Sequence, residues 1–312
     1  MAIKQYLSTL RPMNNKFVNW ILFISLCLIW GSSFKLMKAS VDTLSGMEVG
    51  GLRIFSAALV FIPFAIIYIS KIPKQKLPIV IFSAVIGNLI PAYLFATAMA
   101  HIDGSLGGIL NSLTPISVVL IAILFYKDKV ETGKIIGVFT GFIGLVLLII
   151  APILKGEKSI NFENQEYLLL IVIAIILYGF NVNMVAHKLK DVHPVHAATV
   201  SLAFMSIPAG LILWSQGFFA MNFQDPNVIG DIITASTLGI LGSAVATVLF
   251  YMLLQRAGGL FASLVTYGIP FVALAWGLQD PNDKITWIKV SCLLLILLGV
   301  YLANRTGRKK EA

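Results

Sequence analysis

Charged residues are scarce in this sequence. Only 12% of its 312 residues are Asp, Glu, Lys or Arg, whereas 58% are hydrophobic. Soluble globular domains carry roughly 25% charged residues, so this composition excludes an ordinary soluble domain. Apolar runs of about 20 residues, the length that crosses the hydrocarbon core of a bilayer, follow one another almost without interruption. The sequence therefore predicts an all-α integral membrane protein.

The chain also lacks the residue clusters that enzymes and metal sites need. Its two cysteines, Cys27 and Cys292, lie in apolar runs without metal-ligand spacing, which predicts buried thiols and no disulfide. No phosphate loop of the form GxxxxGKS or GxxxxGKT is present, and Asp, Glu, His and Cys do not cluster near one interface. We therefore expect no catalytic residues, no cofactor and no metal, and a membrane-embedded enzyme is a less favoured alternative.

Carboxylates are absent from the central thirds of the apolar segments between Leu52 and Leu302. Proton relays in transport proteins use buried carboxylates, and Glu48, at the edge of its segment, is the one candidate. The four histidines lie at or just inside segment ends. Coupling to an ion is therefore not predicted, and facilitated diffusion and exchange both stay open.

The net charge of +9 is concentrated in short loops and at the two termini. This pattern orients helices in a membrane and does not indicate a nucleic-acid partner. The long loop from Gln216 to Asp231 has no Lys or Arg, whereas the loops expected in the cytoplasm are rich in Lys. The bias predicts an even number of spans in the plasma (inner) membrane, with both termini cytoplasmic. Ten spans fit it, at residues 19–39, 48–70, 77–100, 104–126, 133–154, 166–186, 194–215, 231–254, 259–279 and 286–304.

The sequence contains an internal repeat. When the sequence is shifted by 155 residues, Gly87 falls on Gly242 and Pro115 on Pro270 without a gap. Ten spans and one duplication give two units of five helices, and because five is odd the second unit must cross the bilayer upside down. Inverted repeats are a recurring transporter architecture with the substrate site near the midplane. The predicted division is a cytoplasmic segment at 1–18, a first repeat at 19–154, an extracytoplasmic linker at 155–165, a second repeat at 166–304 and a basic cytoplasmic tail at 305–312.

One face of the fourth predicted span consists of small and polar residues. The ninth predicted span, in the second copy, has a matching face. Because proline cannot donate a backbone hydrogen bond to the carbonyl four residues back, Pro115 and Pro270 are expected to kink these helices and to free the carbonyls of Asn111 and Thr266. Such a face either packs tightly on a neighbouring helix or lines a wet cavity. For the two polar residues we favour the cavity. The two faces are Gly104, Gly108, Asn111 and Pro115, and Gly259, Ser263, Thr266 and Pro270.

Polar and aromatic residues deep in other apolar runs are further candidates for this cavity. Trp30 and Tyr178 open matching motifs, and Ser33 and Asn181 follow three residues later on the same helix faces. For each asparagine an interhelical hydrogen bond, worth about 0.6 kcal/mol on average, stays open as the alternative. The predicted substrate-cavity residues are Trp30, Ser33, Lys35, Asn88, Asn111, Thr114, Tyr178, Asn181, Ser243, Thr266 and Tyr267.

Two cations lie inside apolar segments. A cation near the middle of a membrane helix costs at least ~2.5 kcal/mol on insertion scales. Lys35 lies toward the outer end of the first segment. Snorkelling of its long stem is favoured, with binding of an anionic substrate group as the alternative. Arg53 is expected to pair with Glu48 and to have a packing or gating role, together with the kinks at Pro115 and Pro270.

Several short motifs, taken in order and spacing, resemble a known family. They are Trp30-Gly31-Ser32-Ser33-Phe34, Asn111-Ser112-Leu113-Thr114-Pro115, Ala262-Ser263-Leu264 and Ile269-Pro270. The chain from about residue 20 to residue 304 is similar to the drug/metabolite transporter superfamily, specifically its ten-helix EamA-type members. The resemblance implies a bundle in which helices of both halves surround a central substrate cavity. It also implies export of small metabolites, amino acids or toxic compounds across the inner membrane.

The leading hypothesis is a secondary transporter that exports small metabolites, such as amino acids or related compounds, by alternating access. Its partners are then a small-molecule substrate and the lipid bilayer; a monomer is expected, and the oligomeric state stays open. A sugar-phosphate or nucleotide-sugar carrier is the rival among transporters, and it would need several midplane cations. A channel or scaffold is disfavoured because the paired prolines indicate access from two sides.

Overall fold

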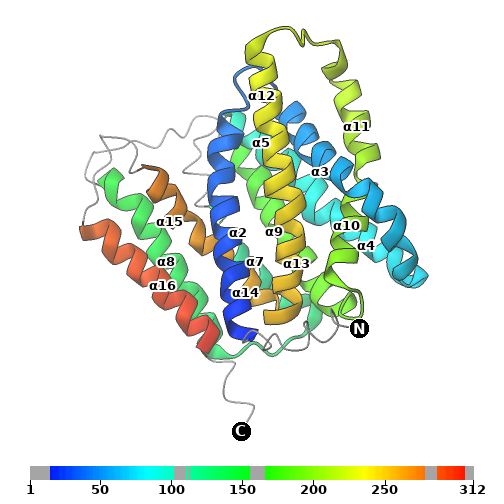
Figure 1. Cartoon of the computed structure of the whole chain (residues 1–312). Coiled ribbons are helices and arrows are strands. Elements are labelled where there is room, and N and C mark those ends of the chain that lie inside the picture. The colour runs from blue at the N-terminus through cyan, green and yellow to red at the C-terminus, as the bar shows by residue number, and fades with distance from the viewer. Residues whose placement is uncertain (1–14, 102–109, 112, 155–165, 278–286, 306–312) are drawn as a thin grey trace, which may run out of the picture.

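A computed structural model describes residues 15–101, 110–111, 113–154, 166–277 and 287–305, and the regular elements in these ranges are helices (Figure 1). Apolar residues without strand-like alternation favour helices because a helix satisfies its own backbone hydrogen bonds in lipid. The helices are α2 (Asn15–Lys38), α3 (Gly46–Tyr68), α4 (Leu77–Ala84), α5 (Ile90–His101), α7 (Thr114–Tyr126), α8 (Thr132–Leu154), α9 (Glu166–Lys188), α10 (Pro194–Phe204), α11 (Ser206–Ser215), α12 (Pro226–Thr237), α13 (Ala246–Ala257), α14 (Gly259–Ser263), α15 (Val265–Gly277) and α16 (Trp287–Arg305).

Six helical stretches are long and apolar enough to cross a membrane. They match the first, second, third, sixth, seventh and eighth ranges that the sequence predicts, so the chain is a multi-pass membrane protein. The other predicted ranges contain shorter apolar helices, and the count of ten spans stays a prediction. The six stretches are Lys16–Met37, Gly46–Lys71, Lys74–His101, Glu166–Lys188, Pro194–Ser215 and Pro226–Ala257.

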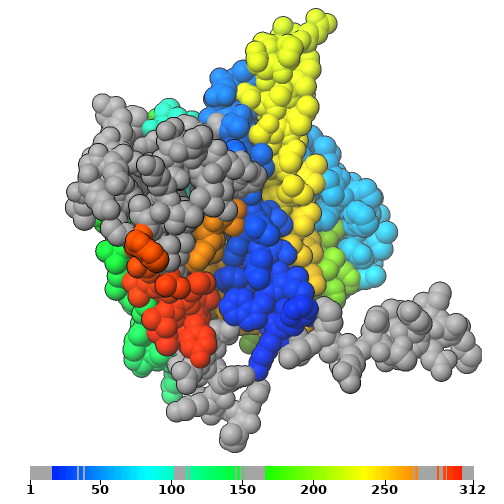
Figure 2. All heavy atoms as spheres, turned by 60° about the vertical axis from the view of Figure 1, so that its left-hand side comes forward, coloured from blue at the N-terminus to red at the C-terminus, as the bar shows by residue number. Residues whose placement is uncertain are grey.

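The outer surface of the bundle is apolar. On α2 the side chains of Phe17, Ile21, Ile24 and Leu28 are exposed, although each is strongly hydrophobic. Figure 2 shows this helix at the surface of the molecule, beside α16. A face of this kind is unfavourable in water and suits lipid tails.

Two of the long stretches contain a π-helical turn at their middle. Val85–Leu89 separates α4 from α5, and Leu238–Val245 separates α12 from α13. The two turns hold Gly87 and Gly242, which the 155-residue shift pairs. A π turn adds one residue to a helix and is frequent at functional sites. Its position depends on neighbouring helices, and the apolar periodicity gives no sign of it.

The helix contacts come in pairs across the predicted halves. α2 packs against α13 and α15, and α9 packs against α5 and α7. α3 packs against α10, and α8 lies along α16 at one edge of the bundle (Figure 1). Under the 155-residue shift α5 corresponds to α13 and α7 to α15, so the first helix of each half packs on the same two helices of the other half.

The backbones of α8 and α16 approach each other closely. A Cβ atom added to Gly299 would overlap the backbone of Gly141, and one added to Gly137 would overlap the backbone of Ala303. Small residues that let helix backbones touch are the usual means of helix association in lipid.

Hydrogen bonds at one end of the bundle fix the relative direction of α2 and α9. Arg256, at the end of α13, donates from Nε to Asn19 Oδ1 near the start of α2 at 3.1 Å. The preceding residue, Gln255, donates from Nε2 to the carbonyl oxygen of Leu189, just past the end of α9, at 3.2 Å. The start of α2 and the end of α9 therefore lie at the same end of the bundle, and the two helices run in opposite directions.

The helix break at Pro115 differs from the expected kink. Pro115 lies in the first turn of α7, where a missing backbone N–H is tolerated, and the carbonyl of Asn111 accepts a hydrogen bond from the Thr114 hydroxyl at 2.6 Å. The preceding part of the predicted fourth span, including Gly104 and Gly108, lies outside the described residues. In the second copy Pro270 lies within α15, and the break comes at Leu264, between α14 and α15 and six residues before the proline.

Candidate functional site

A cavity of ≈ 110 Å³, measured as the space open to the centre of a water molecule, lies among α2, α3, α5, α7, α9, α13, α14 and α15. One water needs about 10–15 Å³ by this measure, so the space suits a small organic molecule. The polar residues of its lining come from both predicted halves. They are Trp30, Ser33, Arg53, Asn88, Asn111, Thr114, Tyr178, Asn181, Ser243, Thr247, Tyr251, Ser263 and Thr266.

The structure brings most of the predicted cavity residues together. From the first half these are Trp30, Ser33, Asn88, Asn111 and Thr114, and from the second half Tyr178, Asn181, Ser243 and Thr266. Most of these side chains are buried, with exposed fractions of 9% for Asn111, 8% for Thr266 and 4% for Asn181.

Lys35 and Tyr267, which were predicted to belong to this set, do not line the cavity. Lys35 is exposed. It follows Ser33 by two residues, or about 200° around an α-helix, so it points away from the cavity that Ser33 faces. Tyr267 donates from its hydroxyl to the carbonyl oxygen of Val138 in α8 at 2.8 Å, so its buried ring ties α15 to α8.

Arg53 has a different place from the one predicted. Its Nε donates to Ser243 Oγ at 2.8 Å, across the predicted halves, and its side chain lines the cavity. Glu48, the expected partner, forms a capping box at the start of α3, in which its Oε2 accepts from the Ser45 backbone N–H at 2.7 Å. The spacing already disfavours the pair, because residues five apart lie on different faces of a helix.

The described residues that line the cavity carry one formal charge. Arg53 is the only Asp, Glu, Lys, Arg or His side chain among the described residues that line it. A cation inside a membrane span costs about 2.5–3.5 kcal/mol on insertion scales. Among the described residues, the side-chain hydrogen-bond partner of Arg53 is the neutral Ser243 hydroxyl, which supplies no counter-charge.

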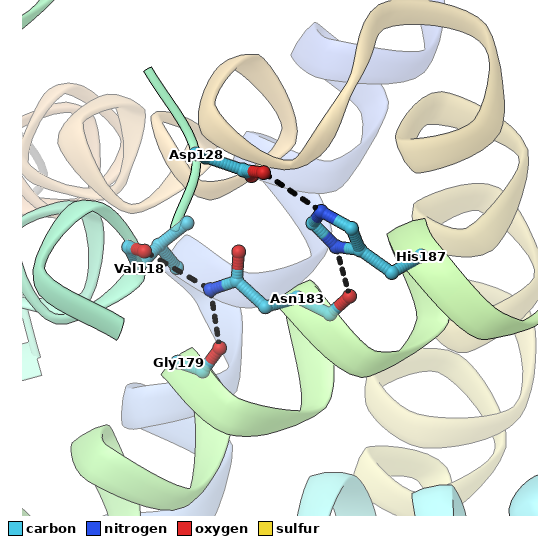
Figure 3. A network of polar contacts seen from close by, with 5 residues as sticks. All are labelled: Val118, Asp128, Gly179, Asn183 and His187. Atoms are coloured by element: carbon cyan, nitrogen blue, oxygen red, sulfur yellow. Dashed lines mark hydrogen bonds and ion pairs between the residues drawn. The ribbon is translucent and has the colours of Figure 1, made fainter. Parts of the chain in front are cut away.

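Three asparagines deep in the apolar helices differ in their hydrogen bonds. Asn88 accepts at Oδ1 from the Thr247 hydroxyl at 3.0 Å, which joins the two π-turn regions. Asn183 lies outside the cavity, and its Nδ2 donates to the carbonyls of Val118 and Gly179 at 3.0 and 2.9 Å (Figure 3). Asn181 lines the cavity, and its buried Oδ1 has no hydrogen-bond partner among the described residues.

Two close contacts repeat across the cavity. A Cβ atom on Gly87 would overlap the amide of Asn181, and a Cβ atom on Gly242 would lie 2.9 Å from Ser33 Oγ. Each glycine thus makes room for a polar side chain on the first helix of the other half. The carbonyl of Gly242 also accepts from Trp30 Nε1 at 3.0 Å.

Aromatic pairs were missed by the prediction. Trp30 lies against Phe250 with ring centroids 5.4 Å apart, and Tyr178 is stacked on Phe95 at 6.0 Å. The 155-residue shift pairs Phe95 with Phe250, and this match was the signal available in the sequence. The match alone does not place these rings at the cavity, because phenylalanine in an apolar run is most often lipid-facing or core.

Gly87→Ala tests the packing at Asn181. The added methyl group overlaps the asparagine amide, so Asn181 must turn away from the cavity. We expect transport to fall at least about tenfold, the effect of losing ~1.4 kcal/mol of recognition, while the amount of folded protein changes little. Flux in liposomes and the melting temperature of the purified variant measure the two effects, and wild-type flux would contradict this role of Gly87.

Polar contacts join the two predicted halves at both ends of the bundle. At the end where α7 and α9 finish, Asp128 Oδ1 lies 3.1 Å from His187 Nε2 (Figure 3). The ring of His187 also stacks on Tyr126. At the opposite end, Asp231 Oδ2 accepts from the backbone and hydroxyl of Thr43, both at 2.7 Å.

An exposed ion pair adds to the first of these ends. Lys76 Nζ lies 3.0 Å from Asp191 Oδ1, and the hydrogen bond from Lys76 lowers the pKa of that carboxyl below its usual value. Exposed ion pairs contribute little to stability because water screens both charges, so this contact adds little to the strength of that end.

Comparison with known proteins identifies the family. The model of the EamA-like transporter family matches the chain twice, at residues 19–150 and 165–305. The chain belongs to the EamA-like transporter family. The double match gives one EamA region on each side of the α8–α9 connection.

Two of the following three relatives of this EamA protein are named as transporters. An uncharacterized transporter of Archaeoglobus fulgidus is 24% identical over 92% of this chain and 98% of its own length. Protein PagO of Salmonella typhimurium is 26% identical over 90% and 91%, and the uncharacterized inner membrane transporter YedA of Escherichia coli is 23% identical over 89% and 90%. These names point to a transporter and away from an enzyme.

A solved structure described only as the crystal structure of a protein shares the fold of this EamA protein. It aligns with a TM-score of 0.69 over 94% of this chain and 98% of that one, at 16% sequence identity. At this identity the likeness concerns the fold alone.

Proposed function

We propose that this protein is a secondary transporter that exports small metabolites, such as amino acids or related compounds, by alternating access around a cavity at the membrane midplane. The observation that carries the proposal is the cavity itself, since matched elements of both halves contribute to its polar lining. Its partners are a small-molecule substrate and the lipid bilayer of the inner membrane.

The proposed architecture is ten spans in two inverted five-helix repeats, at residues 19–154 and 166–304, joined by an extracytoplasmic linker at 155–165. The antiparallel course of α2 and α9 supports the inversion, because these are the first helices of the two repeats. The reciprocal packing of α2 on α13 and α15, and of α9 on α5 and α7, supports a common plan for both halves.

The midplane position has its own support. Gly87 and Gly242, which both line the cavity, lie at the middle of two of the long spans. Interruption of helices by π turns at this depth is tolerated where the backbone faces protein or a wet cavity. Substrate sites of inverted-repeat transporters form at this level from such interrupted helices.

The contacts at the two ends support alternating access. Asp128–His187 at one end and Thr43–Asp231 at the other each join the first half to the second. Opening toward either compartment then requires one of these contacts to break. The distribution of Lys and Arg supports a cytoplasmic location for the Asp128 end, the N-terminal segment 1–18 and the tail 305–312.

A single cation in the lining favours this proposal over a sugar-phosphate or nucleotide-sugar carrier. Phosphate groups carry up to two charges and are recognised by clusters of Arg and Lys. Within the part of the chain that the structure describes, Arg53 is the only Lys or Arg that faces the cavity.

Reconstitution tests the function. Liposomes that contain the protein and are preloaded with labelled amino acids are expected to release them faster than preloaded liposomes without the protein. Runs with and without a pH gradient reveal any proton coupling. Cationic dyes are assayed in parallel to cover a different substrate class. No protein-dependent flux of any of these compounds would contradict the proposal.

A further inference from the structure

We propose that Arg53 is the anion-binding residue of the cavity, and that the cavity selects molecules that carry one carboxylate together with an N–H donor for Asn181. The inference rests on the proposed function, because it names the substrate class of the same site. It replaces the packing or gating role that the sequence favours for Arg53.

Arg53 brings a positive charge to the cavity wall. Its side chain lines the cavity, and Nε donates to Ser243 Oγ at 2.8 Å. A guanidinium has five N–H donors, and the ion pairs between described residues do not include Arg53. A buried charge is stable when a counter-charge accompanies it. A carboxylate fits the guanidinium fork with two parallel hydrogen bonds, so a bound carboxylate supplies that counter-charge.

The number of carboxylates follows from the rest of the lining. The other polar side chains among the described residues that line the cavity, such as Ser243, Asn88 and Thr247, are neutral. A single negative charge on the substrate balances the single positive charge of the described lining. A dicarboxylate or a phosphate dianion brings a second charge that has no cation to meet it among the described lining residues, and burial of that charge is unfavourable.

Asn181 supplies the second recognition point. Its Oδ1 is buried in the cavity wall and has no hydrogen-bond partner among the residues described. Gly87 packs against the amide nitrogen side of the same group, which holds the amide in place. An amide oxygen only accepts hydrogen bonds, and leaving a buried acceptor unpaired is unfavourable. An ammonium or amide N–H of the substrate satisfies it.

The remaining lining favours an apolar body between the two polar groups. Trp30 with Phe250 and Tyr178 with Phe95 provide aromatic walls. Three probes that share a phenyl group separate the contributions: 3-phenylpropionate has only the carboxylate, phenethylamine only the ammonium, and L-phenylalanine both.

Binding of these probes to purified protein in detergent, measured by calorimetry, tests the assignment. Wild-type protein is expected to bind L-phenylalanine best, 3-phenylpropionate next and phenethylamine at least about tenfold more weakly than L-phenylalanine. Arg53→Gln should weaken both carboxylate probes at least about tenfold without weakening phenethylamine. Arg53→Lys keeps the charge without the fork and should be intermediate, and Asn181→Ala should erase the advantage of L-phenylalanine over 3-phenylpropionate.

Tyr267→Phe is the matched control, because Tyr267 is buried close to the cavity wall but does not line it. Its probe affinities should equal those of the wild type. Melting curves verify that each variant is folded, and if Arg53→Gln fails to fold, Arg53→Lys and Asn181→Ala still carry the test.

Three results overturn the inference: binding of phenethylamine as tight as that of L-phenylalanine, unchanged carboxylate affinity in Arg53→Gln, or no binding of either carboxylate probe to the wild type. If liposomes nevertheless export a cationic dye or another compound, the proposed function survives without this substrate class. If no compound is transported, both fail.

Discussion

Asn111→Leu and Thr266→Leu are each expected to abolish transport while the protein still inserts and folds. Both side chains line the cavity from matched positions of the two halves, in α15 and just before α7. Leucine is similar in size to asparagine and larger than threonine, and it replaces a polar wall with an apolar one. Flux in liposomes, normalised to folded protein, measures the effect.

Asn183→Leu is the control for this pair. Asn183 makes hydrogen bonds to Val118 and Gly179 and does not line the cavity. Losing the bond between α9 and α7 should lower stability by about 0.6 kcal/mol, the average for such bonds in membranes, with normal flux per folded molecule. Wild-type flux in both Asn111→Leu and Thr266→Leu, or equal loss in Asn183→Leu, would refute the assignment of the cavity.

Cross-linking the end that contains Asp128 and His187 is also expected to abolish transport. The side chains meet at 3.1 Å and belong to different halves, and alternating access requires the halves to separate there. Asp128→Cys and His187→Cys, combined in a chain whose Cys27 and Cys292 are replaced by alanine, can be joined with a reversible bifunctional thiol reagent. Flux should stop on cross-linking and return on reduction.

The two single-cysteine variants, treated with the same reagent, separate cross-linking from simple modification. They should keep their flux after treatment. Transport that continues in the fully cross-linked double variant would mean that this end does not open, and alternating access would then fail.

Much of the bundle could be predicted because the length of an apolar run decides whether it can cross the membrane. The long runs ending near Lys38, Tyr68 and His101 need only their own composition to become helices, since backbone groups in lipid must be paired internally. Cavity residues such as Asn88 and Asn181 stood out for the same reason. A polar side chain deep in an apolar run is costly unless it meets another polar group or a ligand.

The errors arise where neighbouring helices decide the outcome. Arg53 was assigned to Glu48 by proximity in sequence, but the carboxylate caps its own helix and the guanidinium reaches Ser243 in the other half. Lys35 was chosen for its charge alone, and its position two residues after Ser33 already turns it away from the cavity. Tyr267 is polar and buried, yet its partner is a carbonyl of α8.

The π turns could not be predicted because they arise from packing. Gly87 and Gly242 were recognised as a repeated pair, but glycine in an apolar helix also serves ordinary close packing. In the structure, Gly87 and Gly242 lie against the polar side chains of Asn181 and Ser33, whereas the glycines between α8 and α16 lie against backbone atoms. This difference cannot be read from the sequence.

The side of the membrane on which two equivalent loops lie tests the inverted repeat most directly. Lys129 and Lys284 are equivalent under the 155-residue shift; Lys284 lies outside the described residues. Each is replaced by cysteine in a chain lacking Cys27 and Cys292, and intact cells are treated with a membrane-impermeant maleimide. Only the cysteine at position 284 should react, with the one at 129 reacting after the membrane is opened. Reaction of both from the same compartment would contradict the inversion and the shared cavity that depends on it.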